Sequence, residues 1–528
     1  MKKSLLLVSI AFIVLSCGSQ QKNGNADATA TKKEADPTAY GTTITSAELQ
    51  EMLYTYASDE FEGRNTGDKG QKIAVEYLKD KYVAMGISSA LPNGNYFQNV
   101  PLEKQKSPDV KLTLNGKSFE KNEDFVVYGS SSSQSFSANE IVYVGYGIDS
   151  DTYSDYNNLD VKGKIVIARE GEPKNKAGVY TVSGTTEGSK WSNGRQGLSS
   201  KRDAAKERGA KALFLMDSEM FDRYLPYYKA QDDSGTAGRI SLKNTEQEMI
   251  TFLISAELGS EFIKDINENT TPRVVANKVS AEVTSNSEEL YSENVAAFIK
   301  GSEKPNEIIV ISAHLDHEGI KGGEIYNGAD DDGSGTVAIL EIAQAFKKAV
   351  DDGYKPKRSI LFLHVTGEEK GLLGSRYYTD FDPIFPLENT VADLNIDMIG
   401  RVDAKHNENR NYVYLIGSDK LSSELHKLSE EVNNKYSKMT LDYTYNDEND
   451  PNRYYYRSDH YNFAKNNIPV IFYFNGTHDD YHKPTDTPDK IQYDLLESRT
   501  RLVFYTAWEL ANRPNRIVVD KATEKSAN

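Results

Sequence analysis

The feature that most constrains the fold is a set of four largely apolar runs in the C-terminal half of the chain. They cover residues 308–311, 360–363, 391–396 and 470–474. Helical patterns separate them, and such alternation is typical of a parallel sheet covered by helices on both faces. We therefore expect an α/β domain from residue 294 onward, with a mixed, mainly parallel sheet flanked by helices.

Histidines and carboxylates stand where each of these predicted strands ends. In chain order they are His314 and Asp316, then Glu368 and Glu369, then Asp397, and finally His478 and His482. The carboxyl ends of parallel strands share one edge of a sheet, and ligands bind in the crevice there. We expect these side chains to converge at that edge.

A further group of carboxylates lies in the glycine-rich segment 328–335, directly before a predicted helix at 336–350. Acidic residues at a helix N-terminus also favour the helix dipole, so this segment alone does not indicate a site. Three consecutive aspartates, 330–332, nevertheless repel one another unless a cation offsets them. Glycines on both sides let the backbone bend close to such a cation.

Mixed imidazole and carboxylate ligands suit zinc, with cobalt and manganese as substitutes. Two zinc ions about 3.5–4 Å apart need one bridging carboxylate and terminal ligands on each side. Glu368 and Glu369 are adjacent, so they cannot both point the same way from an extended segment. One can bind metal while the other takes a proton from water, and the pattern therefore favours metal-assisted hydrolysis.

Five segments of the C-terminal half resemble the co-catalytic zinc aminopeptidase family, which includes bacterial leucyl aminopeptidases and glutamate carboxypeptidase. They occur in that family's order, at 314–316, 328–335, 367–375, 395–398 and 481–487, and the opening segment 59–67 is also similar. The resemblance implies a zinc exopeptidase fold. It also implies five ligands for two Zn2+ ions, with Asp331 as the bridge, His314 and Asp397 at one ion, and Glu369 and His482 at the other.

The same resemblance implies that Glu368 is the general base and that Asp316 orients His314. Tyr481 is a candidate for a hydrogen bond to the reacting carbonyl oxygen. His460 and His478 are candidates for contact with the substrate or the metal ligands, although histidines paired with backbone or carboxylate groups explain them equally well.

Two further residues near the predicted site receive weaker interpretations. His317, beside Asp316, is interpreted as lying at the rim of the site. Arg64 is expected to interact with a nearby carboxylate.

The middle of the chain differs in character from both flanks. Residues 126–284 contain short apolar runs separated by polar loops, and the segment 160–166 resembles part of a protease-associated domain. A chain of 528 residues also exceeds what one hydrophobic core usually holds. We expect a β-rich insert at 126–284, inside a peptidase domain formed by 45–125 and 285–513, with a flexible tail at 514–528.

The N-terminus indicates export. Lys2 and Lys3 precede an apolar run at 5–15, which is typical of a signal peptide and too short for a permanent membrane span. Cys17 is the only cysteine, and the segment 15–18 resembles a bacterial lipobox, although a signal peptide with an incidental cysteine is an alternative. The prediction is a signal peptide at 1–16 and a lipidated tether at 17–44. The protein would then be an exported bacterial lipoprotein, membrane-anchored through lipid only, in the periplasm or at the cell surface.

The predicted function is hydrolysis of terminal peptide bonds, with aminopeptidase action preferred. Carboxypeptidase or dipeptidase action would use the same chemistry. The complete ligand set argues against a non-catalytic receptor relative, the paired acids against a single-zinc glutaminyl cyclase, and the histidines against a calcium-binding adhesion module. The formal net charge of -17 argues against a nucleic-acid partner. A peptide is the expected partner, and the oligomeric state stays open.

Overall fold

The computed structural model describes residues 35–128, 132–234, 238–243 and 249–521. The predicted signal peptide, Cys17 and most of the predicted tether lie outside the described residues. From Pro37 onward, the described residues form one compact unit. Within the described part of the chain, none of the helices combines the length and the apolar character needed to cross a membrane.

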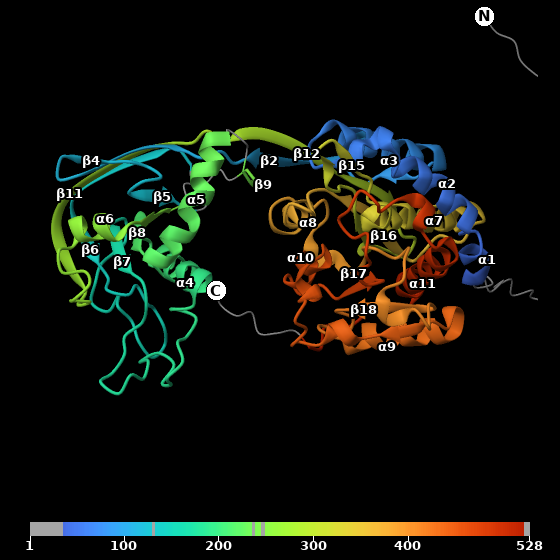
Figure 1. Ribbon diagram of the computed structural model, residues 1–528. Coiled ribbons are helices and arrows are strands. Elements are labelled where there is room, and N and C mark those ends of the chain that lie inside the picture. Colours follow the sequence, from blue (N-terminus) through green and yellow to red (C-terminus); the bar gives the residue numbers. More distant parts are fainter. Residues whose placement is uncertain (1–34, 129–131, 235–237, 244–248, 522–528) are drawn as a thin grey trace, which may run out of the picture. The chain divides into compact units, whose positions relative to one another are not determined.

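The larger sheet contains the strands that the apolar runs predict (Figure 1). Its members are β1 (Ser88–Ser89), β2 (Phe97–Lys104), β9 (Ile240–Leu242), β12 (Glu288–Ile299), β13 (Lys304–His314), β16 (Arg358–Val365), β17 (Thr390–Ile396), β18 (Tyr412–Ile416), β19 (Thr440–Asp442) and β20 (Val470–Phe474). The order is β19-β18-β20-β17-β13-β16-β12-β2-β9, with β1 paired to β12. Strands β20, β17, β13 and β16 are parallel neighbours, and antiparallel β18 and β12 flank them. The predicted mixed sheet is confirmed, with its parallel part at the centre.

Helices cover both faces of this sheet. They are α1 (Pro37–Gly41), α2 (Ser46–Tyr56), α3 (Lys69–Met85), α7 (Gly335–Asp351), α8 (Leu373–Asp380), α9 (Ser423–Val432), α10 (His460–Ala464) and α11 (Tyr493–Asn512). On one face α7 and α11 contact β13 and β16, with α2 and α3 packed against α7. On the other face Tyr378 of α8 and Phe463 of α10 share a core cluster with Val310 of β13.

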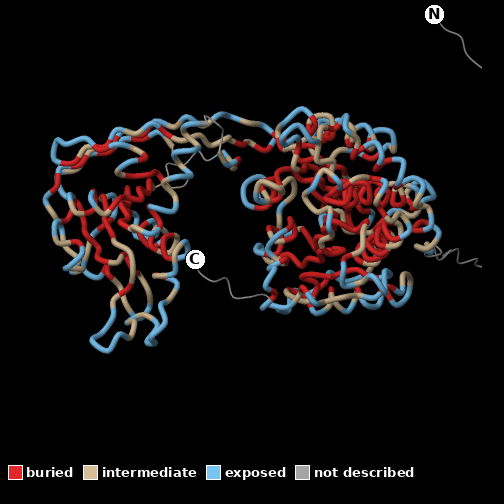
Figure 2. The backbone as a smooth tube through the Cα atoms, viewed as in Figure 1, coloured by how far each residue is buried: buried red, intermediate tan, exposed pale blue. Residues whose placement is uncertain are grey.

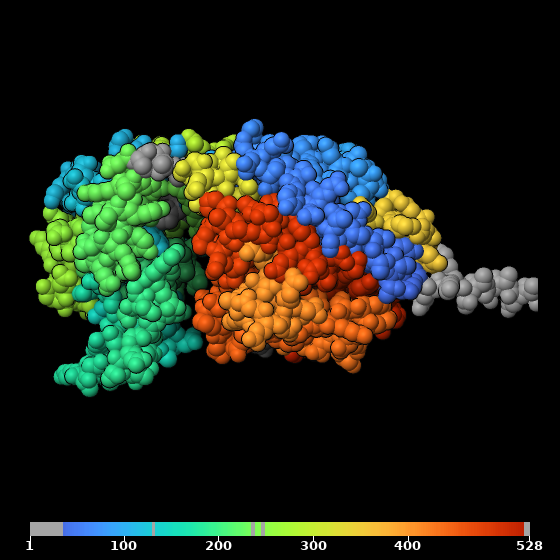
Figure 3. Space-filling model, turned by 45° about the vertical axis from the view of Figure 1, so that its right-hand side comes forward, coloured from blue at the N-terminus to red at the C-terminus, as the bar shows by residue number. Residues whose placement is uncertain are grey.

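Burial explains why the central strands are apolar throughout. Figure 2 shows buried residues concentrated in the sheet and its covering helices. Ile308 to Ile311 are all 2% exposed or less, as expected for a strand packed on both faces. Figure 3 shows the N-terminal helices (blue) beside the C-terminal segment (red), and α11 contacts α1 and α2. The first and last parts of the sequence therefore build the same domain.

The insert is organised around a second sheet, with strand order β4-β3-β11-β6-β7-β8-β10-β5. Its elements are β3 (Asp109–Leu114), β4 (Lys117–Phe119), β5 (Phe125–Val127), β6 (Gln134–Tyr143), β7 (Ile165–Arg169), α4 (Gly194–Glu207), β8 (Ala212–Met216), α5 (Ser218–Ser234), β10 (Ile250–Ile254), α6 (Ala256–Phe262) and β11 (Arg273–Thr284). Because β3 and β4 belong to this sheet, the predicted boundary at 125/126 is too late, and the insert begins after β2. The amphipathic strand at 109–114 carries no apolar run that would separate it from the preceding segment. One strand within the sequence of the insert, β9, belongs to the larger sheet, where it pairs with β2.

Candidate metal centre and active site

The predicted ligands come from the ends of adjacent parallel strands. His314 is the last residue of β13, and Asp397 directly follows β17. Glu369 lies in the turn after β16, and His482 lies in the loop after β20. The topology therefore brings these side chains to one edge of the sheet, as their positions in the sequence predict.

Asp331 lies at the centre of the cluster that these residues form. Its Oδ1 is 3.1 Å from His314 Nε2, and its Oδ2 is 3.0 Å from His482 Nε2. Asp397 Oδ1 is 3.7 Å from His314 Nε2, and Glu369 Oε1 is 3.2 Å from His482 Nε2. All five predicted ligands thus meet in one place, with Asp331 between two imidazoles.

The loop that carries Asp331 is held by its neighbours. It is the short irregular helix Ala329–Ser334 before α7. The carboxylate of Asp486 accepts hydrogen bonds from the backbone N–H groups of Asp330 (2.9 Å) and Asp331 (3.2 Å). Gly328 has φ 54, and a Cβ there would stand only 2.2 Å from the Asp331 carbonyl oxygen. Glycine is therefore required at this turn on both conformational and steric grounds.

Arg64 joins two segments that carry proposed metal ligands. Its guanidinium is fully buried and donates to the carbonyl oxygens of Leu315 (3.2 Å), Tyr56 (3.1 Å), Asn327 (2.8 Å) and Gly328 (2.8 Å). The residue after His314 and the residues before Asp331 are thereby bound to one side chain. The expected pairing of Arg64 with a carboxylate is wrong, because its donors are used by backbone carbonyls.

Asp316 orients His314 by a different route from the predicted one. His314 Nδ1 lies 3.0 Å from the backbone oxygen of Asp316, whereas the nearer carboxylate oxygen is 4.0 Å away. The carboxylate instead accepts hydrogen bonds from Thr66 Oγ1 (2.6 Å) and from the backbone N–H of Glu368 (3.1 Å). Asp316 therefore fixes the segment that bears Glu368 as well as the imidazole.

Glu368 faces the same pocket as the ligands. This pocket is lined by Asp331, Glu368 and Asp397 on its polar side, and by Met398, Tyr454, Phe472 and Phe474 among its other residues. Burial raises the pKa of the Glu368 carboxyl well above its usual range, and the carboxylates of Glu369 and Asp397 add to that rise. A carboxyl in this position is available for proton transfer.

The charges of the ligand groups are strongly coupled. Burial disfavours a charge on Asp331, yet the imidazoles of His314 and His482 hold its pKa well below the usual range. Burial also opposes protonation of His482, yet Asp331 and Glu369 raise its pKa to about 10. The carboxylates therefore attract positive charge to this cluster, which a bound cation would supply.

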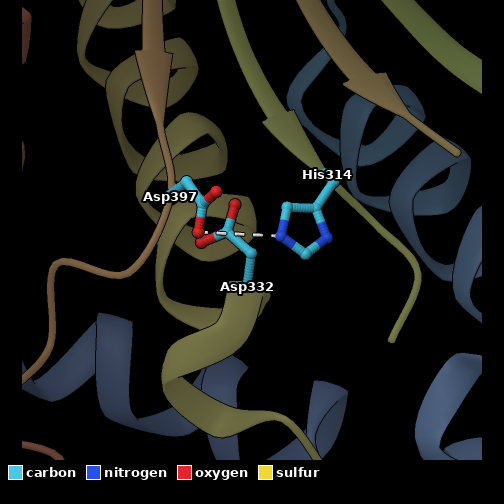
Figure 4. Close-up of side chains that lie close together, drawn as sticks. All are labelled: His314, Asp332 and Asp397. Atoms are coloured by element: carbon cyan, nitrogen blue, oxygen red, sulfur yellow. Dashed lines mark ion pairs between the residues drawn. The ribbon is translucent and has the colours of Figure 1, made fainter. Parts of the chain in front are cut away.

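The cluster fits a metal ion by its unpaired atoms as well as by its residue types. His314 Nε2, Asp332 Oδ2 and Glu369 Oε1 are buried without a hydrogen-bond partner among the described residues. Three groups each bring ligand atoms within 4.8 Å of one another: His314 with Asp332 and Asp397, His317 with Asp331 and Glu369, and Glu318 with Glu369 and His482. Figure 4 shows the first group, in which the His314 ring points toward both carboxylates. Imidazole and carboxylate donors at this spacing fit zinc.

Three residues in these groups, Asp332, His317 and Glu318, have no ligand role among the sequence-based expectations. Asp332 directs a carboxylate toward His314, with its Oδ1 held by the backbone N–H groups of Gly335 and Met398. His317 is 0% exposed, so its predicted place at the rim is wrong. The spacing of His314 and His317 could have indicated a second buried imidazole. The turn that directs it inward, however, depends on contacts distant in sequence.

The three predicted substrate contacts have different surroundings. Tyr481 is half-buried, lines the pocket and stacks on His482 with ring centroids 3.9 Å apart. His478 is paired with a carboxylate, since its Nε2 lies 3.2 Å from Asp330 Oδ2. His460 is fully buried and stacks on Phe472 at 4.7 Å, so the expected substrate contact is wrong for this residue.

The part of the chain that bears the cluster is similar to known peptidases. Residues 294–507 match the profile of peptidase family M28. The glutamate carboxypeptidase 2 homolog of Caenorhabditis elegans is 25% identical over 299 residues, covering 49% of this chain and 37% of that protein. A probable leucine aminopeptidase 2 of Aspergillus oryzae is 34% identical over 146 residues, covering 28% of this chain and 26% of that protein. The chain spans well under half the length of these relatives.

Solved structures with a similar fold include bacterial aminopeptidases. The aminopeptidase from Aneurinibacillus sp. strain AM-1 has a TM-score of 0.47 and 20% identity, over 92% of this chain and 99% of that one. A zinc aminopeptidase from Bacillus subtilis has a TM-score of 0.45 and 18% identity, over 89% of this chain and 96% of that one. The segment 294–507, which contains every proposed ligand of the cluster, is the part of the chain that matches peptidase family M28.

Proposed function

We propose that this protein is a zinc-dependent exopeptidase with two metal ions per chain, and that it acts first as an aminopeptidase. The observation that carries the proposal is the convergence of His314, Asp331 and His482 at one sheet edge, beside the carboxyl of Glu368 that lines the same pocket. The names of the M28 relatives support peptide hydrolysis.

The proposed metal residues divide into two sets around Asp331. His314 and Asp397 would hold one ion, and Glu369 and His482 the other, with Asp331 shared between them. Zinc bound there lowers the pKa of water and polarises a carbonyl group. Cobalt or manganese would suit the same donors.

Glu368 is the proposed general base. Its carboxyl lines the pocket and accepts a proton from the attacking water, then delivers it to the leaving amine. Asp316 keeps Glu368 in place through the backbone N–H of that residue. Burial raises the pKa of Tyr481, so its phenol stays protonated and can donate to the developing oxyanion.

The apolar side of the pocket is the proposed site for a substrate side chain. Met398, Tyr454, Phe472 and Phe474 belong to one buried cluster against which Tyr481 packs. Such a surface favours a large apolar side chain next to the scissile bond.

A direct test compares one short peptide in free, N-blocked and C-amidated forms, with metal analysis of the same preparation. Aminopeptidase action requires the free amine and tolerates the amide. Loss of hydrolysis on amidation alone would instead support carboxypeptidase action, whose chemistry is the same. Absence of zinc together with absence of hydrolysis would remove the proposal.

We also propose that the protein is an exported lipoprotein anchored through Cys17, with the insert at 105–284 acting as a protease-associated-like domain. The apolar run at 5–15 and the single cysteine support the first part. Labelling with a radioactive fatty acid tests it, since Cys17→Ser should abolish incorporation.

A further inference from the structure

A third imidazole lies at the metal centre beside the two predicted ones. His317 is 0% exposed, and its Nδ1 is 3.0 Å from Glu369 Oε1 and 3.9 Å from Asp331 Oδ2. Its ring meets that of His482 at a centroid distance of 5.8 Å and an angle of 76°. His317 therefore faces the second ion's residues from a buried position, whereas His482 is 35% exposed.

The contact between His317 and Glu369 is not a hydrogen bond. Neither nitrogen of His317 has a hydrogen-bond partner among the described residues, and Glu369 Oε1 also lacks one, although the two atoms are in contact. His314 Nε2 shows the same combination, since it lies 3.1 Å from Asp331 Oδ1 without a hydrogen bond. His317 thus shares the geometry of a predicted metal ligand.

The separations between the imidazole nitrogens and the carboxylate oxygens are close to those of a zinc coordination shell. Zinc bound at about 2.0–2.1 Å by four tetrahedral ligands places the ligand atoms about 3.3 Å apart. The separations at this centre are 3.0 and 3.9 Å from His317 Nδ1 to Glu369 and Asp331, and 3.2 and 3.0 Å from His482 Nε2 to the same carboxylates. Each of the two imidazoles therefore lies within 4 Å of both carboxylates.

The fold holds the His317 ring in this orientation. Its backbone N–H donates to the Arg64 carbonyl oxygen at 3.3 Å, and Asn65 forms an isolated bridge with it. Gly328 leaves the space that the ring fills, because a Cβ there would stand 2.5 Å from His317 Cγ. A buried imidazole with both nitrogens unpaired costs free energy, and a ligand bond would offset that cost.

We propose that His317 is a further ligand of the ion held by Asp331 and Glu369, bound through Nδ1 together with His482. The inference rests on the proposed metal centre. It assigns the second ion two imidazoles and two carboxylates, with the shared Asp331 carboxylate linking it to the first ion.

The test measures zinc affinity directly, by equilibrium dialysis against zinc buffers with elemental analysis. The proteins are the wild type, His317→Ala, His317→Asn, and His426→Ala as an imidazole deletion on α9. A residue that only orients a ligand costs about 10–100-fold in metal affinity, so loss of a true ligand should exceed about 100-fold for the second ion. Both His317 variants should show that loss while keeping the first ion, and His426→Ala should bind two ions as the wild type does.

Asparagine separates the two roles of His317. Its side chain keeps an N–H donor near the place of Nδ1 but lacks an imidazole nitrogen for zinc. Wild-type affinity in His317→Asn would overturn the inference while leaving the proposed function intact. A wild type that binds no zinc would overturn both.

A crystal structure of the zinc-loaded wild type covers the case in which the variants do not fold. Anomalous scattering should place an ion about 2.0–2.1 Å from His317 Nδ1. An ion beyond bonding distance from that atom would overturn the inference.

Discussion

The insert and the edge of the larger sheet bury charged groups in opposite ways. Lys201 of α4 is 2% exposed, and its ammonium donates to the carbonyl oxygens of Tyr146, Arg169 and Gly171 at 2.7, 3.0 and 2.8 Å. At the sheet edge, His314 Nε2 and Glu369 Oε1 are equally buried but lack hydrogen-bond partners among the described residues. The first arrangement is complete without a ligand, whereas the second requires one.

Convergence matters more than the lack of a partner. His460 also has two unpaired nitrogens in the described structure, but burial lowers its pKa to about 3, so its ring is neutral. It stands against Phe472 with no carboxylate paired to it among the described residues. Buried polar atoms without a hydrogen-bond partner thus indicate a metal where several of them face one another. A single such atom only costs free energy, which the fold tolerates.

Replacement of the proposed base should have the largest effect. We expect Glu368→Gln to lower kcat by about 10²–10⁴-fold, because the proton acceptor is lost, while zinc content stays at the wild-type value. Steady-state kinetics and elemental analysis check both parts. Glu431→Gln, at a side chain 63% exposed on α9, is the matched control. Loss of zinc from Glu368→Gln would show that Glu368 is a ligand. The groups at the sheet edge that need a metal would then include Glu368.

Replacement of Tyr481, which lies beside His482, should cause the second largest loss of kcat. Removal of one oxyanion donor costs about 10²–10³-fold in kcat, so Tyr481→Phe should fall in that range with little change in KM. Tyr456→Phe provides a control, because that ring is 44% exposed and does not line the pocket. Unchanged turnover in Tyr481→Phe would remove the assigned role.

The pH dependence of the free energy of unfolding tests how the insert buries Lys201 without a ligand. Burial lowers its pKa from 10.5 to about 8. Between these values the unfolded chain binds more protons than the folded one. The free energy of unfolding should therefore rise with pH across this interval, by at most about 3 kcal/mol, and this contribution should vanish as the pH falls to 8.

Lys201→Met should lack this rise, and denaturant titrations of both proteins at several pH values measure the difference. Zinc content and activity per folded molecule should match the wild type, because no metal residue is touched. Parallel pH profiles of stability in the two proteins would contradict the assignment, and a loss of zinc would break the separation between the two regions.

Glu341 sharpens the rule for isolated buried groups. Burial, and then the charge of Glu48, raises the pKa of this α7 carboxyl from 4.5 to about 8, and its Oε2 lacks a partner within the described structure. The folded chain binds the extra proton, so stability should fall as the pH rises from 4.5 through 8. Glu341→Gln should therefore be more stable than the wild type above that pH, by at most about 5 kcal/mol. Thermal denaturation at two pH values would show it, and a destabilised variant at high pH would refute the interpretation.

Much of the fold and of the metal cluster could be predicted because the signals are local. The apolar run at 308–311 ends in His314, and the parallel neighbours of β13 end in the same way. The direction of a side chain after a strand ends is not local. His317 turns inward because its backbone binds Arg64 and its ring fits over Gly328, and neither contact leaves a periodic pattern.

Contacts between residues distant in sequence also explain the other differences between the predictions and the structure. The carboxylate of Asp316 is taken by Thr66, which lies 250 residues earlier in the chain. The strand at 109–114 has exposed and buried residues in turn, so its pattern does not distinguish it from its flank. Propensity and spacing identify which residues are present at the sheet edge, whereas tertiary contacts decide which atoms face one another.

The Arg64 clamp also limits what can be separated from this protein. The guanidinium that joins the two loops with proposed ligands lies 251 residues before Leu315, one of the residues whose carbonyl oxygens accept its hydrogen bonds. A fragment expressed from residues 294–507 alone would contain every proposed ligand, yet its loops would lack the hydrogen bonds from Arg64. During synthesis, too, the centre can assemble only after the ribosome has passed the whole insert and the earlier segment has been recruited back.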